Sequence, residues 1–251
     1  MLIIRLIFRL IGFLSIVVLM LPLVLLIITF SQKVNKRKLN KKTINIWSKT
    51  LCFVCGLKLT TKGKVLSNPV LIVANHVTWL DIPVIHCYKL VGFVAKAEIA
   101  KWPILNIVAK CGESLFITRG RQESRKEVLE GIKIRLKNGR SIAIFPEGKA
   151  TDGKTLERFH RQLIHAAIEE QKPIQALAIK YINKQGRRNE QIPFKKGENF
   201  IKNIVRILSL PPSTVEVTFC TPIETINISA RKAAEKSHSQ VAEVLALNDY
   251  L

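Results

Sequence analysis

Short apolar runs alternate with amphipathic segments along most of the chain. The apolar runs after residue 56 are about four to eight residues long, as is typical of buried β-strands. They predict strands over residues 57–61, 70–74, 91–95, 114–118, 141–145, 174–181 and 214–220. The intervening segments predict a helix that begins near residue 82 and further helices over residues 40–57, 98–110, 122–137, 155–169, 199–208 and 229–247. This alternation indicates an α/β fold in which a mainly parallel sheet is flanked by helices.

The N-terminal segment has a different pattern. Residues 10–30 contain no charged side chain and consist mostly of Leu, Ile, Val and Phe. About 20 apolar residues can span a bilayer, so we predict a membrane-anchoring segment over residues 1–32. The cleavage site that would follow a signal peptide is not present. Pro22 can kink a membrane helix or divide it into a helical hairpin that enters one leaflet, and both arrangements remain open.

Basic residues are concentrated directly after the apolar run. The run is followed by Lys33, Lys36, Arg37, Lys38, Lys41 and Lys42 and is preceded by Arg5 and Arg9. The heavier basic side predicts that the rest of the chain faces the cytoplasm. Over the whole chain, 40 Lys and Arg residues against 18 Asp and Glu residues give a net charge of +22. With an apolar segment beside it, this charge favours membrane lipids over nucleic acid as the anionic partner.

We expect three parts in the chain. The anchoring segment over residues 1–32 is followed by a basic, amphipathic connection over residues 33–62 and by the domain proper over residues 63–251. Cys52 and Cys55 have the CxxC spacing, but neither a second cysteine pair nor a histidine pair follows, so no metal site is predicted. The sequence also lacks a P-loop and a GxGxxG motif, which argues against nucleotide hydrolysis and dinucleotide binding.

A histidine and an aspartate follow the strand predicted at residues 70–74. This strand leads into the sequence Asn-His-Val-Thr-Trp-Leu-Asp at residues 75–81. Residues five apart in a straight helix point about 140° away from each other, so His76 and Asp81 can meet only across a bend. A loop that enters a helix near Asp81 would supply it, and the carboxylate could then orient an imidazole that accepts a proton. The alternative is a buried histidine beside a helix-capping aspartate.

Further charged residues follow two other predicted strands. Arg119 comes after the strand at residues 114–118, and Glu147 and Gly148 come after the strand at residues 141–145. Parallel strands end at one edge of a sheet, where a base, a cation and a carboxylate would suit acyl or phosphoryl transfer with an anionic substrate. A guanidinium group can bind phosphate through two hydrogen bonds. Taken alone, however, Arg119 and Glu147 are equally consistent with a solvated arginine and a turn residue.

Three motifs together resemble those of the glycerolipid acyltransferase family. They are Asn75-His76-x4-Asp81, Phe116-Ile117-x-Arg119 and Phe145-Pro146-Glu147-Gly148, in this order. The resemblance implies transfer of a fatty acyl group from acyl-CoA or acyl-carrier protein to the free hydroxyl of a lysophospholipid, first of all 1-acyl-sn-glycerol-3-phosphate. It implies no cofactor and no metal, and it places a bacterial member at the inner (cytoplasmic) membrane.

The resemblance also implies a role for each motif residue. His76 would be the general base and Asp81 would orient it, while Arg119 would bind the acceptor's phosphate. Glu147 and Gly148 would shape the acceptor site. Ala150 stands where the family commonly has an arginine, which is similar to relatives that acylate other lysolipids, such as lyso-ornithine lipid. Another lysolipid acceptor, or a catalytically inactive membrane-binding protein, is therefore the alternative. A lipid hydrolase is not supported, because the Gly-x-Ser-x-Gly motif is missing.

Overall fold

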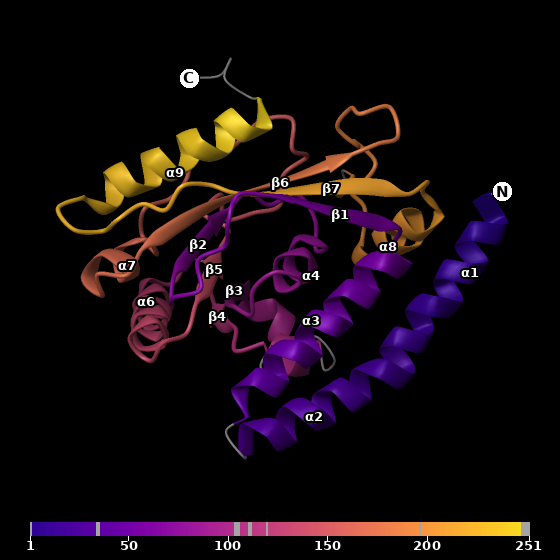
Figure 1. Cartoon of the computed structure of the whole chain (residues 1–251), viewed down its shortest axis with the longest axis horizontal. Helices are drawn as coiled ribbons and strands as arrows, with labels where there is room; N and C mark the ends of the chain where they lie inside the picture. The colour runs from indigo at the N-terminus through magenta and orange to yellow at the C-terminus, as the bar shows by residue number, and fades with distance from the viewer. Residues whose placement is uncertain are drawn as a thin grey trace.

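The strands form a single mixed sheet (Figure 1). The computed structural model describes residues 2–33, 36–102, 106–109, 112–118, 120–195 and 197–246. In these residues, seven strands are ordered β1-β7-β6-β2-β5-β3-β4. Their bounds are Leu57–Lys62 (β1), Leu71–Ala74 (β2), Gly92–Lys96 (β3), Leu115–Ile117 (β4), Ile142–Ile144 (β5), Ile174–Ile182 (β6) and Ser213–Phe219 (β7). All neighbours are parallel except β6 and β7. The predicted α/β class with a mainly parallel sheet is confirmed.

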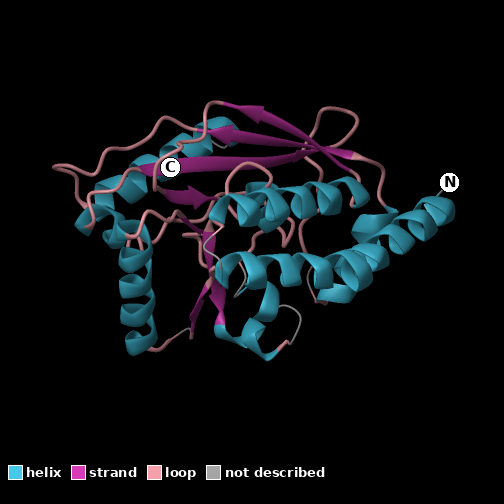
Figure 2. Cartoon of the chain, turned by 60° about the horizontal axis from the view of Figure 1, so that its bottom comes forward, coloured by secondary structure: helices cyan, strands magenta, loops and turns pink. Residues whose placement is uncertain are grey.

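Helices cover both faces of the sheet (Figure 2). One face packs against α3 (Arg37–Val54), α4 (Asp81–His86) and α8 (Phe200–Ser209), and the other against α6 (Gln122–Lys137), α7 (His165–Glu169) and α9 (Ala230–Leu245). Successive residues of a strand point to opposite faces, and β2 illustrates this. Ile72 and Ala74 join the first core, whereas Leu71 and Val73 join the second. Burial on both faces explains why the parallel strands are almost continuously apolar.

The N-terminal apolar segment is one long, continuous helix that contains a single π-helical turn. It consists of α1 (Leu2–Ser15), the π-helical turn η1 (Ile16–Met20) and α2 (Leu21–Lys33). The stretch Leu2–Ser31 is long and apolar enough to cross a membrane. A proline interrupts α-helical hydrogen bonding, and the π turn that ends two residues before Pro22 accommodates it without breaking the helix. The chain turns back only after α2, and α3 then runs alongside α2 (Figure 1).

Both parts of this long helix are attached to the rest of the protein. At its beginning, the guanidinium groups of Arg5 and Arg9 donate hydrogen bonds to the carbonyl oxygens of Ser209 (3.1 Å) and Leu210 (2.7 Å) at the end of α8. Towards its end, Val24 and Ile28 share a small buried core with Ile44 of α3. Arg5 and Arg9 therefore lie beside the domain rather than far from it.

Two of the predicted helices are only partly helical in the structure. In the range 98–110, where we expected one helix, the chain forms a 3₁₀ helix, η2 (Ala97–Lys101), that ends where Trp102 adopts an extended conformation, and residues 106–109 are helical again. A proline follows Trp102, and a residue before proline disfavours the helical conformation. Residues 103–105 and 110 of this prediction lie outside the described residues.

The helix expected over residues 155–169 is also wrong for most of its length. Only α7 (His165–Glu169) is helical, and the preceding residues form an irregular segment. Its backbone N–H groups serve tertiary contacts instead: Glu157 donates to the side chain of Glu147 (3.1 Å), and His160 donates to the carbonyl of Pro146 (3.0 Å). These contacts override the helical periodicity of the apolar residues.

Candidate active site

His76 and Asp81 meet at the carboxyl edge of the sheet. Strand β2 ends at Ala74 and α4 begins at Asp81, so residues 75–81 form the expected bend, which we call the histidine loop. Nδ1 of His76 lies 2.8 Å from Oδ2 of Asp81. The Asp81 side chain is fully buried, while that of His76 is 20% exposed. With Nδ1–H donating to the carboxylate, Nε2 carries the lone pair that can accept a proton.

Both oxygens of Asp81 are held by other groups. Oδ2 also accepts the backbone N–H groups of Val77 (2.8 Å) and Thr78 (3.0 Å). Oδ1 accepts the hydroxyl of Tyr181 at 2.7 Å. Burial, followed by the nearby Asp81 carboxylate, raises the pKa of Tyr181, so the phenol stays protonated and can donate this hydrogen bond. The carboxylate is therefore fixed in the position that orients the imidazole.

Two further contacts fix the histidine loop and its ring. The side chain of Asn75 bonds to the backbone of Ile179 on β6, accepting from its N–H (2.8 Å) and donating to its carbonyl (3.0 Å). The ring of His76 stacks on Phe145, with centroids 4.0 Å apart and an angle of 15° between the ring planes. Phe93 continues the stack behind Phe145 at 5.8 Å. The imidazole thus lies against an apolar wall, with one ring edge held by Asp81.

Glu147 holds backbone groups behind the histidine. Its Oε1 accepts the N–H of His76 (2.8 Å) and its Oε2 accepts the N–H of Glu157 (3.1 Å). The residue is 5% exposed, and burial raises the pKa of Glu147 to about 7. The polar atoms of this side chain therefore connect the histidine loop to the segment that follows β5.

Gly148 closes the turn that contains Glu147. Its N–H donates to the carbonyl of Phe145 at 3.0 Å, and its φ of +74° lies in the left-handed region that favours glycine. A Cβ atom at this position would meet nothing within 4 Å, so the backbone here borders open space. This placement is compatible with the predicted acceptor site. Arg119, the predicted phosphate-binding residue, lies outside the described residues, two positions after the end of β4.

The segment after Gly148 also contacts the histidine loop. The carbonyl of His76 accepts hydrogen bonds from the backbone N–H (2.9 Å) and the hydroxyl (3.3 Å) of Thr151. Nearby, the ammonium group of Lys149 lies 3.0 Å from a carboxylate oxygen of Glu157, and both side chains are largely exposed. The positive charge of Lys149 is thus offset by a neighbouring negative charge.

Sequence reasoning missed Tyr181 and Thr151. Tyr181 is the last residue of a predicted strand, and β6 pairs with β2 in the sheet. The rule that drew attention to polar residues at strand ends could therefore have indicated Tyr181. Thr151 had no such signal, because it lies in an irregular segment and acts partly through its backbone.

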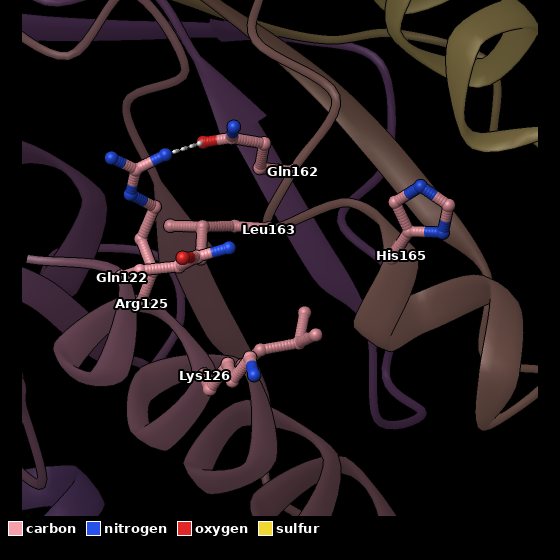
Figure 3. A pocket seen from close by; sticks show the side chains of 7 residues that line it. Gln122, Arg125, Lys126, Gln162, Leu163 and His165 are labelled. Atoms are coloured by element: carbon pink, nitrogen blue, oxygen red, sulfur yellow. Dashed lines mark hydrogen bonds between the residues drawn. The ribbon is translucent and has the colours of Figure 1, made fainter.

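A surface hollow is lined by none of the site residues described above, His76 included (Figure 3). Its volume is about 230 Å³, and it lies between α6 and the segment that enters α7. The hollow is lined by Gln122, Arg125, Lys126, Leu129, Gln162, Leu163 and His165. Within the described part of the chain, no three His, Cys, Asp or Glu residues are grouped so that they could hold a metal ion.

Known proteins resemble this chain in sequence and in fold. A family model described as Acyltransferase matches residues 56–180. A lyso-ornithine lipid O-acyltransferase of Pseudomonas aeruginosa is 30% identical over 203 residues, which cover 81% of this chain and 78% of that protein. A 1-acyl-sn-glycerol-3-phosphate acyltransferase of Neisseria gonorrhoeae is 27% identical over 192 residues, which cover 76% and 75% of the two chains.

A solved structure extends the likeness to nearly the whole fold. The crystal structure of the 1-acyl-sn-glycerophosphate acyltransferase PlsC from Thermotoga maritima matches with a TM-score of 0.76. The match covers 99% of this chain and 96% of that chain at 19% sequence identity. The two chains share one α/β architecture. The chain belongs to the acyltransferase family.

Proposed function

We propose that this acyltransferase moves a fatty acyl group from an acyl thioester to the free hydroxyl of a lysophospholipid, with His76 as the general base. The donor would be acyl-CoA or acyl-carrier protein. One observation supports the proposal most strongly: the buried carboxylate of Asp81 lies 2.8 Å from Nδ1 of His76, whose side chain remains 20% exposed. The pair thus leaves Nε2 free to accept a proton from a substrate.

In the proposed reaction, Nε2 of His76 accepts the proton of the acceptor hydroxyl while the hydroxyl oxygen attacks the thioester carbonyl carbon. A carbon–oxygen bond forms, the carbon–sulfur bond breaks, and the imidazolium returns its proton to the leaving thiolate. Asp81 stabilises the imidazolium and keeps the correct tautomer. Glu147 accepts the backbone N–H of His76, and Tyr181 donates to the carboxylate of Asp81, so both residues position the catalytic pair without touching the substrate. The chain's own nucleophiles are not acylated in this scheme.

The first candidate acceptor is 1-acyl-sn-glycerol-3-phosphate, whose acylation gives phosphatidate. In this reading Arg119 binds the phosphate, and the open space beside Gly148 receives the acceptor. The same acceptor appears in the name of the Neisseria gonorrhoeae relative.

A specific observation favours a second candidate, a lysolipid with a zwitterionic head group such as lyso-ornithine lipid. Ala150 stands where the family commonly has an arginine, and the ammonium group of Lys149 lies 3.0 Å from the carboxylate of Glu157. Pairing lowers the positive potential that would attract a phosphate dianion. Relative kcat/KM values for lysophosphatidate and lyso-ornithine lipid decide between the two acceptors.

We also propose that the long apolar helix lies in one leaflet of the inner membrane, with the domain on the cytoplasmic side. Large apolar side chains of this helix are highly exposed, among them Ile3 (68%), Phe8 (73%) and Leu19 (70%). Arg5 and Arg9 bond to the end of α8, so the start of the helix stays beside the domain. A helix that crossed the bilayer would have to separate these arginines from the domain.

Thiol release from an acyl thioester tests the reaction class. The purified protein is incubated with the thioester in the presence and absence of a lysolipid. A transferase releases thiol only when the acceptor is present. Release without the acceptor would indicate a thioesterase, and no release with any lysolipid would indicate a binding protein; either result would contradict the proposal.

A further inference from the structure

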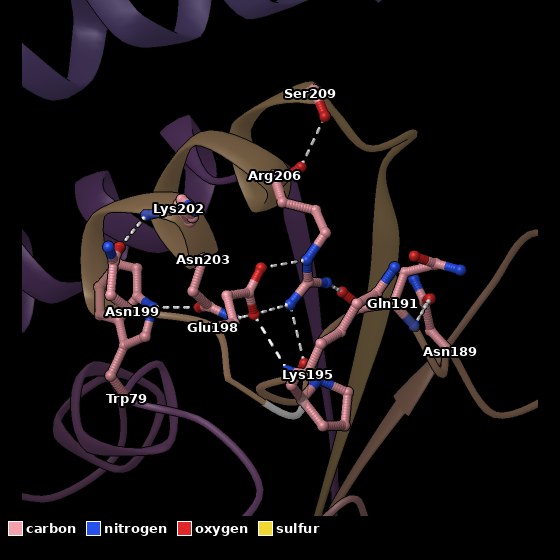
Figure 4. Close-up of polar contacts among 11 residues, drawn as sticks. Trp79, Asn189, Gln191, Lys195, Glu198, Asn199, Lys202, Asn203, Arg206 and Ser209 are labelled. Atoms are coloured by element: carbon pink, nitrogen blue, oxygen red, sulfur yellow. Dashed lines mark hydrogen bonds and ion pairs between the residues drawn. The ribbon is translucent and has the colours of Figure 1, made fainter.

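The side chain of Trp79 leaves the histidine loop and reaches α8 (Figure 4). Trp79 lies between His76 and Asp81 in the sequence and is partly buried. Its indole N–H donates a hydrogen bond to Oδ1 of Asn203 at 3.0 Å. Asn203 is fully buried, 124 residues further along the chain. Burying an amide side chain costs folding free energy unless its polar atoms are hydrogen-bonded. The hydrogen-bond partners of Asn203 therefore indicate its role.

The other half of the Asn203 amide is equally fixed. Its Nδ2 donates to Oε2 of Glu198 at 2.9 Å, and this oxygen also accepts the backbone N–H of Lys195 at 3.0 Å. Arg206 binds both oxygens of Glu198, at 2.7 and 2.6 Å. Its guanidinium group lowers the pKa of Glu198 to about 2, so the carboxylate is charged and can only accept. The amide nitrogen of Asn203 must therefore face Glu198, which leaves the amide oxygen for Trp79.

Aromatic contacts hold the indole ring from two further sides. Phe200 of α8 meets it edge-on at a centroid distance of 5.6 Å, and Phe13 of α1 does so at 6.4 Å. Helix α1 is itself bonded to the end of α8, through contacts such as Arg9 to the carbonyl of Leu210. The indole thus lies where the histidine loop, α8 and the apolar N-terminal helix come together.

The position of Trp79 affects the aspartate through its neighbour in the chain. Thr78 precedes Trp79 and donates its N–H to Oδ2 of Asp81 at 3.0 Å. The same oxygen accepts the hydrogen bond from Nδ1–H of His76. A shift of the indole therefore changes the donor set around the carboxylate that orients the histidine.

We propose that Asn203 is a positioning residue for acyl transfer: by accepting the indole N–H of Trp79, it holds the histidine loop in its productive conformation. Asn203 does not touch the substrate and acts only through Trp79. The proposal rests on the proposed function of His76. It also makes α8 the element that connects the apolar N-terminal helix to the reacting group.

A double-mutant cycle tests this role. Asn203→Leu keeps the side-chain volume but removes the acceptor, and Trp79→Phe keeps an aromatic ring but removes the donor. Because small displacements of a reacting group are costly, we expect each variant to lower kcat by about 10- to 100-fold, with KM for thioester and lysolipid within about twofold of wild type. The double variant should be no slower than the slower single variant, since both substitutions remove the same hydrogen bond between Trp79 and Asn203.

Asn199→Ala is the matched control. Asn199 caps the same helix by accepting the N–H of Lys202 at 2.9 Å, so its loss destabilises α8 without removing an acceptor from Trp79. We expect a lower melting temperature with kcat within about twofold of wild type. The proposal is overturned if Asn203→Leu turns over like wild type, or if the double variant loses the product of the two single losses.

A readout that needs no turnover separates this proposal from the proposed function. The indole ¹⁵N–H resonance of Trp79 is assigned in the full-length protein by its disappearance in Trp79→Phe. It should move in Asn203→Leu and stay in place in Asn199→Ala, while the resonances of Trp47 and Trp102 serve as internal references. An unmoved Trp79 resonance overturns the proposal. If the wild type acylated no lysolipid at all, the proposed function would fall, whereas the shift would still support the contact between Asn203 and Trp79.

Discussion

The hydroxyl of Tyr181 donates a hydrogen bond of 2.7 Å to Oδ1 of Asp81, although the two residues are 100 positions apart in the chain. The contact joins the end of β6 to the start of α4. It holds the carboxylate oxygen that does not face His76, and so it determines how the other oxygen is presented to the imidazole.

Tyr181→Phe removes this donor and keeps the ring. We expect kcat to fall by about tenfold, because a hydrogen bond to a charged group contributes roughly 1.5–3 kcal/mol and here orients a catalytic partner. Tyr88→Phe is the control, since the hydroxyl of Tyr88 makes a longer contact, 3.4 Å, to the carbonyl of Thr60. Equal turnover by Tyr181→Phe and wild type would show that the hydroxyl does not position Asp81.

Glu147 gives the protein a pH-dependent stability. Its carboxyl group has a folded-state pKa of about 7 against an ordinary value of 4.5, because it is buried. At pH values between 4.5 and about 7, the carboxyl group of Glu147 is therefore mostly protonated in the folded state and mostly ionised in the unfolded state. The stabilisation is fully present below about pH 4.5 and is lost as the pH rises through about 7.

We therefore expect Glu147→Gln to lack this loss. Relative to the variant, the wild type should lose on the order of 3 kcal/mol of unfolding free energy between pH 4.5 and pH 8. Thermal melts of both proteins across this range measure the difference. Glu157→Gln is the control, because the side chain of Glu157 is 47% exposed and should change little. Parallel pH profiles for the wild type and Glu147→Gln would contradict the burial argument.

The one-leaflet arrangement predicts where the N-terminus can be labelled. Arg5 bonds to α8, so the start of the helix lies beside the domain. A cysteine in a short polar extension added before Met1 should react with a membrane-impermeant maleimide in inverted vesicles and not in intact spheroplasts. The protein with the same extension but without its cysteine gives the background from the chain's own cysteines. Labelling from the outer side alone would show that the helix crosses the membrane.

Ala150→Arg tests the acceptor by restoring the missing cation. Ala150 is exposed beside the Lys149–Glu157 ion pair, so the new side chain has room. If the site admits lysophosphatidate, an additional guanidinium should lower KM for it by about 5- to 20-fold, equivalent to roughly 1–2 kcal/mol. KM for a zwitterionic lysolipid should stay within about twofold. An equal change for both acceptors would place residue 150 away from the head group.

The sequence predicts the sheet and the histidine–aspartate pair because both depend on local pattern. The parallel strands are buried on both faces and are therefore almost continuously apolar, and α6 follows its predicted bounds because Val128, Ile132 and Leu136 recur every four residues. The contact between His76 and Asp81 needs only a bend between a strand and a helix that are adjacent in the chain.

The remaining features depend on contacts between distant segments. The partners of Asp81 and Trp79, Tyr181 and Asn203, are 100 and 124 residues away, and local periodicity contains no information about such pairs. The segment before α7 has helical spacing of its apolar residues, yet the backbone N–H of Glu157 donates a hydrogen bond to the buried side chain of Glu147 instead of to a helical carbonyl. Tertiary hydrogen bonding decides the structure there.

Replacement of His76 tests the central claim most directly. The measurement is kcat for thiol release in the presence of a lysolipid, for wild type and His76→Ala, with circular dichroism and a thermal melt to establish that the variant is folded. Loss of a general base typically costs about 10²- to 10⁴-fold, so we expect a loss of that size with acceptor binding retained. A folded His76→Ala protein that turns over at a rate near that of the wild type would contradict the account.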